Sequence, residues 1–289
     1  MFQAIIKEMR PKQWAKNVFL LAAIIFDRQL TNPEAIFRTA AGFVLFSLLS
    51  SCVYIINDLS DIEADRNHPK KKNRPIAAGK ISIPLAISVL IGLLIVSFSA
   101  SWMLSPSFSL IALIYFLINL AYSKWLKHIP LIDVMIIATG FVLRVAAGVS
   151  LIQVERFSPW LYVVSTLLAL FIALGKRRSE IVLLADDANS TRKVLDGYTL
   201  GLLDQLMIIV SSTTIMGYCL YSFSAPNLPD NHTMMLTIPF VLYGIFRYHY
   251  LVQVKKEGGA PDELILSDKP LMATGALYGL SVLIIFYLF

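Results

Sequence analysis

Three aspartates recur at helical spacing where a long apolar stretch ends. Asp58, Asp61 and Asp65 follow Asn57 in the pattern N-D-x-x-D-x-x-x-D, within the segment YIINDLSDIEADRNHPKKKNRPIAAGK at 54–80. If a helix continues through this segment, each residue advances by about 100°, which brings the three carboxylates within about 60° of one another. Like charges on one face repel, so this cluster requires a cation between its members.

Mg²⁺ is the cation that best suits such a cluster. It prefers oxygen ligands and commonly bridges one or two carboxylates to substrate phosphates. The segment that follows is basic, and its side chains are suited to phosphate oxygens: Arg66, His68, Lys70, Lys71, Lys72 and Arg74. Acids for a metal beside bases for phosphate indicate a diphosphate site. The lysine run is equally typical of a topology signal at a membrane face.

A second charged group ends a later apolar stretch, in the sequence LGKRRSEIVLL. Lys176, Arg177 and Glu180 are neighbours on one helix at spacings of three and four. One interpretation is a second phosphate clamp facing the first motif, with Glu180 holding metal or orienting a base. The alternative is a set of surface ion pairs at a helix end. Asp186 and Asp187 follow in a polar stretch and are expected to be solvated.

The sequence AYSKWLKHIPLID adds Tyr122, Lys124 and Lys127 at the polar end of another apolar stretch. Asp133 and Arg144 fall inside the stretch that follows. Ionisable residues at membrane depth are functional candidates. Arg144 is expected either to lie just outside the acid cluster or to pair with Asp133 for structure alone.

Long apolar helices must position these residues. Of the 289 residues, 57% are hydrophobic and 15% charged, with a mean hydropathy of +0.68, whereas soluble domains carry about 25% charged residues. A helix needs about 20 apolar residues to cross a bilayer. Nine spans are predicted, at 17–31, 36–57, 83–104, 107–123, 129–150, 158–175, 203–224, 233–253 and 271–288. They are too long and too uniform for barrel strands. We therefore expect an all-α polytopic membrane protein with one domain, 1–289.

Charge placement orients these spans. With a cytosolic N-terminus and an external C-terminus, most Lys and Arg residues fall on the cytosolic side, as the positive-inside rule requires. The longest cytosolic connections are then 58–82, 176–202 and 254–270. Exceptions include Arg28, Arg38, Arg144 and Arg156. The net charge of +6 reflects cytosolic loops beside anionic lipid, so no nucleic-acid partner is expected.

The N-terminal segment and the cysteines are expected to have structural roles. Residues 1–16 lack the apolar core and cleavage site of a signal peptide, and they are expected to lie at the membrane interface with Trp14 at headgroup depth. Cys52 and Cys219 fall inside predicted spans. They are expected to be buried, without a disulfide or a metal.

The motifs together resemble the UbiA superfamily of intramembrane prenyltransferases, and within it the branch of decaprenyl-phosphate phosphoribosyltransferases. The matching segments are RPKQWAKN at 10–17, NDLSDIEADRNHPKKKNRPIAAG at 57–79, YSKWLKHIPLIDV at 122–134, GFVLRVAAG at 140–148 and GKRRSE at 175–180. Most superfamily members carry a second D-x-x-x-D motif after the sixth span. This sequence has Lys176 to Glu180 there instead, with Leu184 at the later position.

The resemblance implies a helical bundle around a central cavity that opens to lipid and is capped by cytosolic loops. It implies Mg²⁺-dependent transfer of a 5-phosphoribosyl group from 5-phosphoribosyl 1-diphosphate to a decaprenyl-like polyprenyl phosphate in the cell (inner) membrane, with a cytosol-facing site. The catalytic residues implied are Asp58, Asp61, Lys71 and Arg74, and the metal ligands are Asn57, Asp58, Asp61 and Asp65. The substrate-binding residues implied are Lys16, Asn57, Tyr122, Lys127, Arg144, Lys176, Arg177 and Glu180.

Two readings compete with this one. A prenyltransferase acting on an aromatic or other small acceptor keeps the fold and the first motif, but the missing second aspartate motif disfavours it. A non-enzymatic lipid-binding or transport protein predicts ionisable residues along a path through the bilayer, whereas the acids here gather at one face. Arg10, Lys12 and Lys16 either hold the lipid phosphate or make ordinary headgroup contacts.

Overall fold

The computed structural model describes residues 1–67, 71–154, 159–185, 193–226, 228–257, 259, 261, 264 and 267–288. Within these residues every regular element is a helix, which confirms the all-α class. The chain divides into two compact units, and each is described by itself. Unit 1 comprises Met1–Ile24, Gln29–Lys124 and Leu143–Gln153, and unit 2 comprises Ile25–Arg28, Trp125–Val142 and Val154–Phe289.

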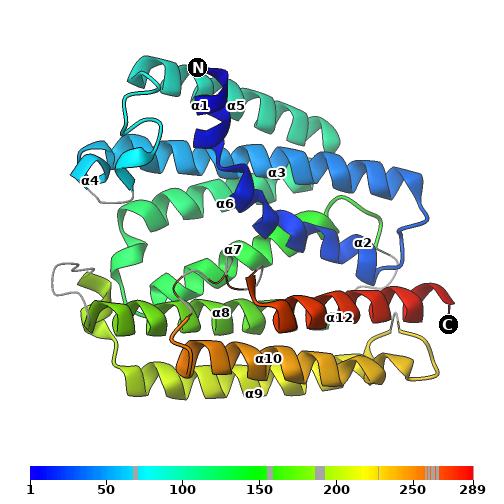
Figure 1. Cartoon of the computed structure of the whole chain (residues 1–289). Helices are drawn as coiled ribbons and strands as arrows, with labels where there is room; N and C mark the ends of the chain where they lie inside the picture. Colours follow the sequence, from blue (N-terminus) through cyan, green and yellow to red (C-terminus); the bar gives the residue numbers. More distant parts are fainter. Residues whose placement is uncertain are drawn as a thin grey trace. The chain divides into compact units, whose positions relative to one another are not determined.

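Unit 1 is built on three long helices that pack on one another, α3, α5 and α6 (Figure 1). Its elements are α1 (Phe2–Met9), η1 (Pro11–Leu21), the start of α2 (Ala22–Phe26), α3 (Pro33–Ser60), α4 (Ile62–Asn67), η2 (Lys71–Asn73), α5 (Ile83–Leu104), α6 (Pro106–Lys124) and the end of α7 (Ile132–Val149). In α1 and η1 the chain runs along α3, which carries the aspartate motif.

Unit 2 is built on α8, α9, α10 and α12, which run side by side (Figure 1). Its elements are the end of α2, η3 (Leu126–His128), the first part of α7, α8 (Pro159–Ala185), η4 (Lys193–Gly197), α9 (Leu200–Ser224), η5 (Thr233–Thr237), α10 (Ile238–Gln253) and α12 (Lys269–Leu288). The basic motif lies in the last turns of α8, and η4 leads into α9.

Local sequence signals fix where the long helices begin. Proline is the first residue of α3, α6 and α8, a position where its missing N–H costs no hydrogen bond. Asn32 caps α3, since its side-chain oxygen accepts from the N–H groups of Glu34 and Ala35 at 3.1 and 3.4 Å. Thr199 caps α9 by accepting from the N–H of Leu202 at 3.1 Å. The apolar runs therefore start as helices where the sequence predicts.

Eight helices among the described residues are long and apolar enough to cross a membrane, and each corresponds to one of the predicted spans. Many side chains on them are exposed and apolar, as in α5, where Ile95, Trp102 and Met103 are more than 60% exposed. Such surfaces suit lipid. The remaining predicted span, 17–31, is divided between η1 and α2, and the count of nine is not confirmed. The chain is an integral membrane protein.

Close packing in unit 1 depends on one glycine of the motif GFVLRVAAG. A Cβ atom built on Gly148 in α7 would lie 2.0 Å from the carbonyl oxygen of Leu20 in η1. Leu20 is completely buried in the core that also contains Phe46, Phe108 and Leu151. The glycine therefore allows the N-terminal segment to approach α7.

We expect Gly148→Ala to destabilise the protein, because backbone atoms must move to admit the methyl group. Overpacking of this kind costs about 1–3 kcal/mol, which should lower the thermal unfolding midpoint in detergent by several degrees. Gly92→Ala in α5 is the matched control, since a Cβ there meets no atom within 4 Å. Equal midpoints for the two variants would contradict this account of the packing.

Candidate active site

Two of the three aspartates converge on one arginine in unit 1. Asp58 is 2% exposed and Asp65 is 1% exposed. Arg74 places Nη1 at 3.0 Å from Oδ1 of Asp58 and at 2.5 Å from Oδ2 of Asp65. The Nζ of Lys71 lies 3.8 Å from the other oxygen of Asp65. The cation that the clustered acids require is therefore supplied by the basic segment that follows them in the chain.

A second arginine holds Asp58 from the N-terminal segment. Arg10 donates from Nη2 to both carboxylate oxygens of Asp58 at 2.6 Å, and its guanidinium lies 4.9 Å from the centre of the Tyr54 ring. Arg10 has a left-handed backbone, with φ of 54°, where α1 ends and η1 begins. The bend between these elements thus directs Arg10 to the acid cluster. Arg10 pairs with Asp58 in the structure, and its expected contact with lipid phosphate stays a prediction.

The third aspartate lies apart from this ion-pair network. Helix α3 ends at Ser60, and Asp61 follows with φ of −105° and ψ of 15°, outside the helical region. Asp61 is half-buried, as is Asn57, whose carbonyl accepts from the N–H of Asp61 at 3.0 Å. Across the described ranges, no three acids, cysteines or histidines lie close enough to share a metal. Helix α3 ends at Ser60, so the predicted face of three carboxylates is interrupted at Asp61, and the binding of a metal ion by the three aspartates stays a prediction.

The carboxylates of Asp58 and Asp65 can still bind Mg²⁺ in the way that is common in proteins. Asp58 and Asp65 both lie within 3.0 Å of a single nitrogen of Arg74, so their carboxylates can also approach a single ion. Protein sites for Mg²⁺ commonly use one or two carboxylates, with waters and substrate phosphates as the other ligands. Such an ion would compete with Arg10 and Arg74 for the same oxygens. An arginine that the ion displaces from these carboxylates would then lie beside the substrate phosphates, which arginine is suited to bind.

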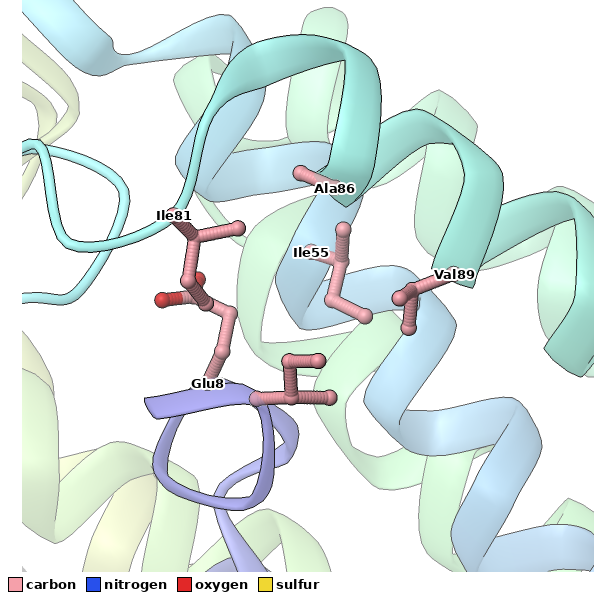
Figure 2. Close-up of a pocket in the computed structure, with 6 residues that line it drawn as sticks. Glu8, Ile55, Ile81, Ala86 and Val89 are labelled. Carbon is pink, nitrogen blue, oxygen red and sulfur yellow. The ribbon is translucent and has the colours of Figure 1, made fainter. Parts of the chain in front are cut away.

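A fourth acid that the sequence analysis did not identify lies next to Asp58. Glu8 of α1 is 2% exposed and lines a pocket with Ile5, Ile55, Ile81, Ala86 and Val89 (Figure 2). Its Oε2 lies 3.4 Å from the N–H of Ile76. Burial, followed by the neighbouring Asp58 carboxylate, raises the pKa of Glu8 to about 8, against the opposing effects of the Ile76 N–H and Arg10. Glu8 is therefore largely protonated at neutral pH.

Unit 2 contains a separate network around the basic motif. Arg177 is 1% exposed and donates from Nε to Oδ2 of Asp133 at 2.5 Å. Its Nη1 donates to Oε2 of Glu180, three residues further along α8. Tyr198 donates to Oδ1 of Asp133 at 2.5 Å. The alternative interpretation of this motif is a set of surface ion pairs at a helix end. The structure has ion pairs at this position, but they are buried. Contact of Arg177 with substrate stays a prediction.

The two residues that flank Arg177 differ in their surroundings. Arg178 pairs with Asp204 of α9 at 2.6 Å and donates to the carbonyl of Val252 in α10 at 3.3 Å, so it joins three helices. Lys176 is half-buried. Both arginines of the motif are therefore engaged by acids within unit 2, and the contact of Lys176 with phosphate stays a prediction.

Arg144 lies in a buried polar network of unit 1. Its Nε donates to Oδ1 of Asn17 at 2.8 Å and its Nη2 to the Tyr115 hydroxyl at 2.9 Å. Asn17 in turn donates to Ser47 at 2.9 Å. Asp133, the alternative partner expected for Arg144, pairs with Arg177 instead. The polar side chains of Asn17 in η1 and Tyr115 in α6 thus make a guanidinium tolerable at membrane depth.

The other predicted site residues that the structure describes are half-buried. Lys16 is half-buried in η1, Tyr122 is half-buried near the end of α6, and Lys127 is half-buried in η3. The functional contacts expected of these three stay predictions. His68, Lys70, Asp186 and Asp187 lie outside the described residues.

With this geometry established, comparison with known proteins identifies the family. The model of the UbiA prenyltransferase family matches residues 18–264. The chain belongs to this family. It is 34% identical over 289 residues to decaprenyl-phosphate phosphoribosyltransferase of Corynebacterium glutamicum, covering 98% of this chain and 87% of that one. It is 32% identical to the protein of the same name from Mycobacterium tuberculosis H37Rv, covering 92% and 89%.

A solved structure supports the same UbiA fold. A UbiA homolog from Archaeoglobus fulgidus, bound to GPP and Mg²⁺, superposes with a TM-score of 0.74. The alignment covers 97% of this chain and 99% of that one, at 21% identity. This likeness confirms the predicted UbiA fold.

Three features of this UbiA chain were missed from the sequence: the buried acid Glu8, the pairing of Arg10 with Asp58, and Tyr198. Glu8 and Arg10 lie two residues apart, across the end of a short helix whose bend the sequence does not reveal. Tyr198 lies 65 residues from Asp133, beyond the reach of any spacing rule. Only the pairing of Arg10 with Asp58 has a signal in the sequence, the presence of opposite charges in the two segments.

The raised pKa of Glu8 predicts how stability depends on pH. Its pKa rises from 4.5 to about 8, so the stabilisation from the protonated carboxyl is complete below about 4.5 and is lost as pH rises through about 8. Glu8→Gln keeps a neutral side chain at every pH. Between pH 5 and 9, its thermal unfolding midpoint in detergent without divalent metal should fall less than that of the wild type.

Glu63→Gln in α4 is the control for this measurement, because Glu63 is exposed, with 82% of its side chain accessible. Its midpoint should follow that of the wild type at each pH. A parallel fall for Glu8→Gln and the wild type would show that Glu8 does not titrate in this range.

Proposed function

We propose that this protein transfers the 5-phosphoribosyl group of 5-phosphoribosyl 1-diphosphate to a polyprenyl phosphate of the decaprenyl type and releases diphosphate. The observation that carries the proposal is the near-full-length similarity to decaprenyl-phosphate phosphoribosyltransferases. The sequence K-R-R-S-E at 176–180 supports it. A donor that bears a 5-phosphate as well as a diphosphate favours a lysine there over a second pair of metal-binding acids.

The acid cluster of unit 1 is proposed to hold the donor diphosphate. Asp58 and Asp65, together with Asp61 and Asn57, would hold the metal ion. Held there, Mg²⁺ supplies Lewis-acid neutralisation of the leaving diphosphate. Arg74 and Lys71 share this task, since both already lie beside the acids.

The transfer itself exchanges one C–O bond for another. The bond from C1 of the ribose to the diphosphate breaks, and its electron pair leaves with the diphosphate. An oxygen of the polyprenyl phosphate forms the new bond to C1 from the opposite face. This oxygen is already anionic, so the step requires no general base. The protein contributes position and electrostatic stabilisation.

The remaining candidates are proposed to bind the two substrates. Lys176 and Glu180 of unit 2 bind the phosphorylated ribose, with Arg177 holding Glu180 in place. In unit 1, Lys16 is proposed to bind the lipid phosphate, with Tyr122 and Arg144 as further substrate contacts. Lys127 of unit 2 is proposed to assist them. The proposal treats residues 1–289 as one catalytic domain.

We also propose nine membrane crossings, with the N-terminus and the acid cluster on the cytosolic side of the cell (inner) membrane. Eight crossings are the long helices already described. The first is the predicted span 17–31, whose residues lie in η1, α2 and the segment that follows α2.

The activity is tested with purified protein, Mg²⁺, polyprenyl phosphate and 5-phosphoribosyl 1-diphosphate labelled in the ribose. We expect label to appear in the lipid extract in step with diphosphate release. Absence of labelled lipid would overturn the proposal. Consumption of a prenyl diphosphate in its place would favour the prenyltransferase reading.

Asp61→Asn tests the metal ligands, because Asp61 lies outside the ion pairs made by Arg10 and Arg74. We expect the rate of transfer to fall about a hundredfold or more, the scale of losing one electrostatic contact in an active site. The unfolding midpoint should stay close to that of the wild type. Glu34→Gln, at the start of α3, is the control and should keep full activity. Full activity in Asp61→Asn would remove Asp61 from the site.

A further inference from the structure

Four side chains of unit 2 form a continuous chain of hydrogen bonds. Tyr198 donates to Oδ1 of Asp133, and Arg177 donates from Nε to Oδ2 of the same carboxylate, both at 2.5 Å. Arg177 also donates from Nη1 to Glu180. The order is therefore Tyr198, Asp133, Arg177, Glu180. The chain joins the segment after η4, the start of α7 and the last turns of α8.

Burial distinguishes the members of this chain. Asp133 and Arg177 have side chains 0% and 1% exposed, and Tyr198 is 6% exposed. The side chain of Glu180 is 20% exposed, so it is the member nearest to solvent. Buried charges are tolerated only when they are paired and hydrogen-bonded. Removal of one donor from Asp133 must therefore disturb the position of Arg177, and with it Glu180.

Tyr198 is fixed from two directions. Its hydroxyl accepts from the N–H of Leu131 at 2.6 Å. The preceding residue, Gly197, packs against Pro130 so closely that a Cβ would lie 2.2 Å from the proline ring. Burial and the hydrogen bond to Asp133 raise the pKa of Tyr198 above its usual range, so the hydroxyl keeps its proton and remains a donor. Tyr198, the first member of this series of hydrogen bonds, is thus held in place on both sides.

We propose that Tyr198 and Asp133 are positioning residues that orient Glu180, through Arg177, toward the phosphorylated sugar donor. The inference rests on the proposed function, which gives Glu180 a contact with that donor. Tyr198 acts only through the chain of hydrogen bonds. Its loss should therefore weaken donor binding and leave the binding of polyprenyl phosphate unchanged.

Steady-state kinetics of Tyr198→Phe test this inference, because phenylalanine keeps the ring and removes only the hydroxyl. We expect KM for 5-phosphoribosyl 1-diphosphate to rise about five- to tenfold, the scale of one typical hydrogen bond within a protein. The kcat should change less than twofold, and KM for polyprenyl phosphate should stay constant. The matched control is Tyr218→Phe, a buried tyrosine of the same unit whose hydroxyl contacts Thr237 at 2.5 Å; it should leave both KM values unchanged.

A double-mutant cycle separates positioning from general damage. If Tyr198 acts through Glu180, the variant Tyr198→Phe/Glu180→Gln should have the same donor KM as Glu180→Gln alone. Full additivity of the two effects would overturn the proposal. Should Tyr198→Phe fail to fold, Asp133→Asn breaks the same chain at its second member and is measured in the same cycle.

A binding measurement distinguishes failure of this inference from failure of the proposed function. Thermal unfolding of each variant is followed with and without 5-phosphoribosyl 1-diphosphate and Mg²⁺. Stabilisation of the wild type, reduced in Tyr198→Phe, supports the positioning role. Equal stabilisation of the two overturns that role alone. No stabilisation of the wild type, with no labelled lipid in the transfer assay, overturns the proposed function and this inference with it.

Discussion

Arg74 lies between two buried carboxylates, and the organisation of the candidate site in unit 1 depends on this ion pair. Asp58 and Asp65 come from successive helices, α3 and α4, and Arg74 comes from the segment that follows them. Without a shared cation, two carboxylates with almost no exposure would repel each other and lose solvation. Arg74 therefore holds the aspartate motif and the basic segment that follows it together. In the proposed function, the same proximity places Arg74 and Lys71 beside the leaving diphosphate.

In unit 2 a buried charge is again paired with opposite charges, but the residues are different. Arg177 is almost completely buried, and its charge is matched by Asp133 and Glu180. A motif that looks strongly basic in the sequence is therefore much less basic in the structure. The ion pairs therefore fix the side chains of Arg177 and Glu180 in the last turns of α8.

The sequence predicts the helices well and the side-chain contacts poorly. Eight of the nine predicted spans correspond to single long helices, because apolar length and proline at the first helical position are local properties. The sequence predicts a cation beside Asp58 and Asp65, and the structure has Arg74 there. No local pattern indicates that Arg10 and Arg74 reach the same oxygens, and a metal ion at this site stays a proposal. Asp61 follows the end of α3, and the change in its backbone has no periodic signal in the sequence.

In the proposed function, the fold and the choice of donor depend on different parts of this protein. The A. fulgidus homolog, solved with GPP, shares the fold at 21% identity, so this likeness concerns the fold and not the donor. We propose that the donor is selected in the last turns of α8, where K-R-R-S-E replaces a second aspartate motif. Arginine at 177 and aspartate at 133 stabilise each other in the interior, and the acid left nearest to solvent is Glu180. One oriented carboxylate beside a lysine is suited to bind the hydroxyls and phosphate of a sugar. It is less suited to bind a second metal ion, which would need several acids.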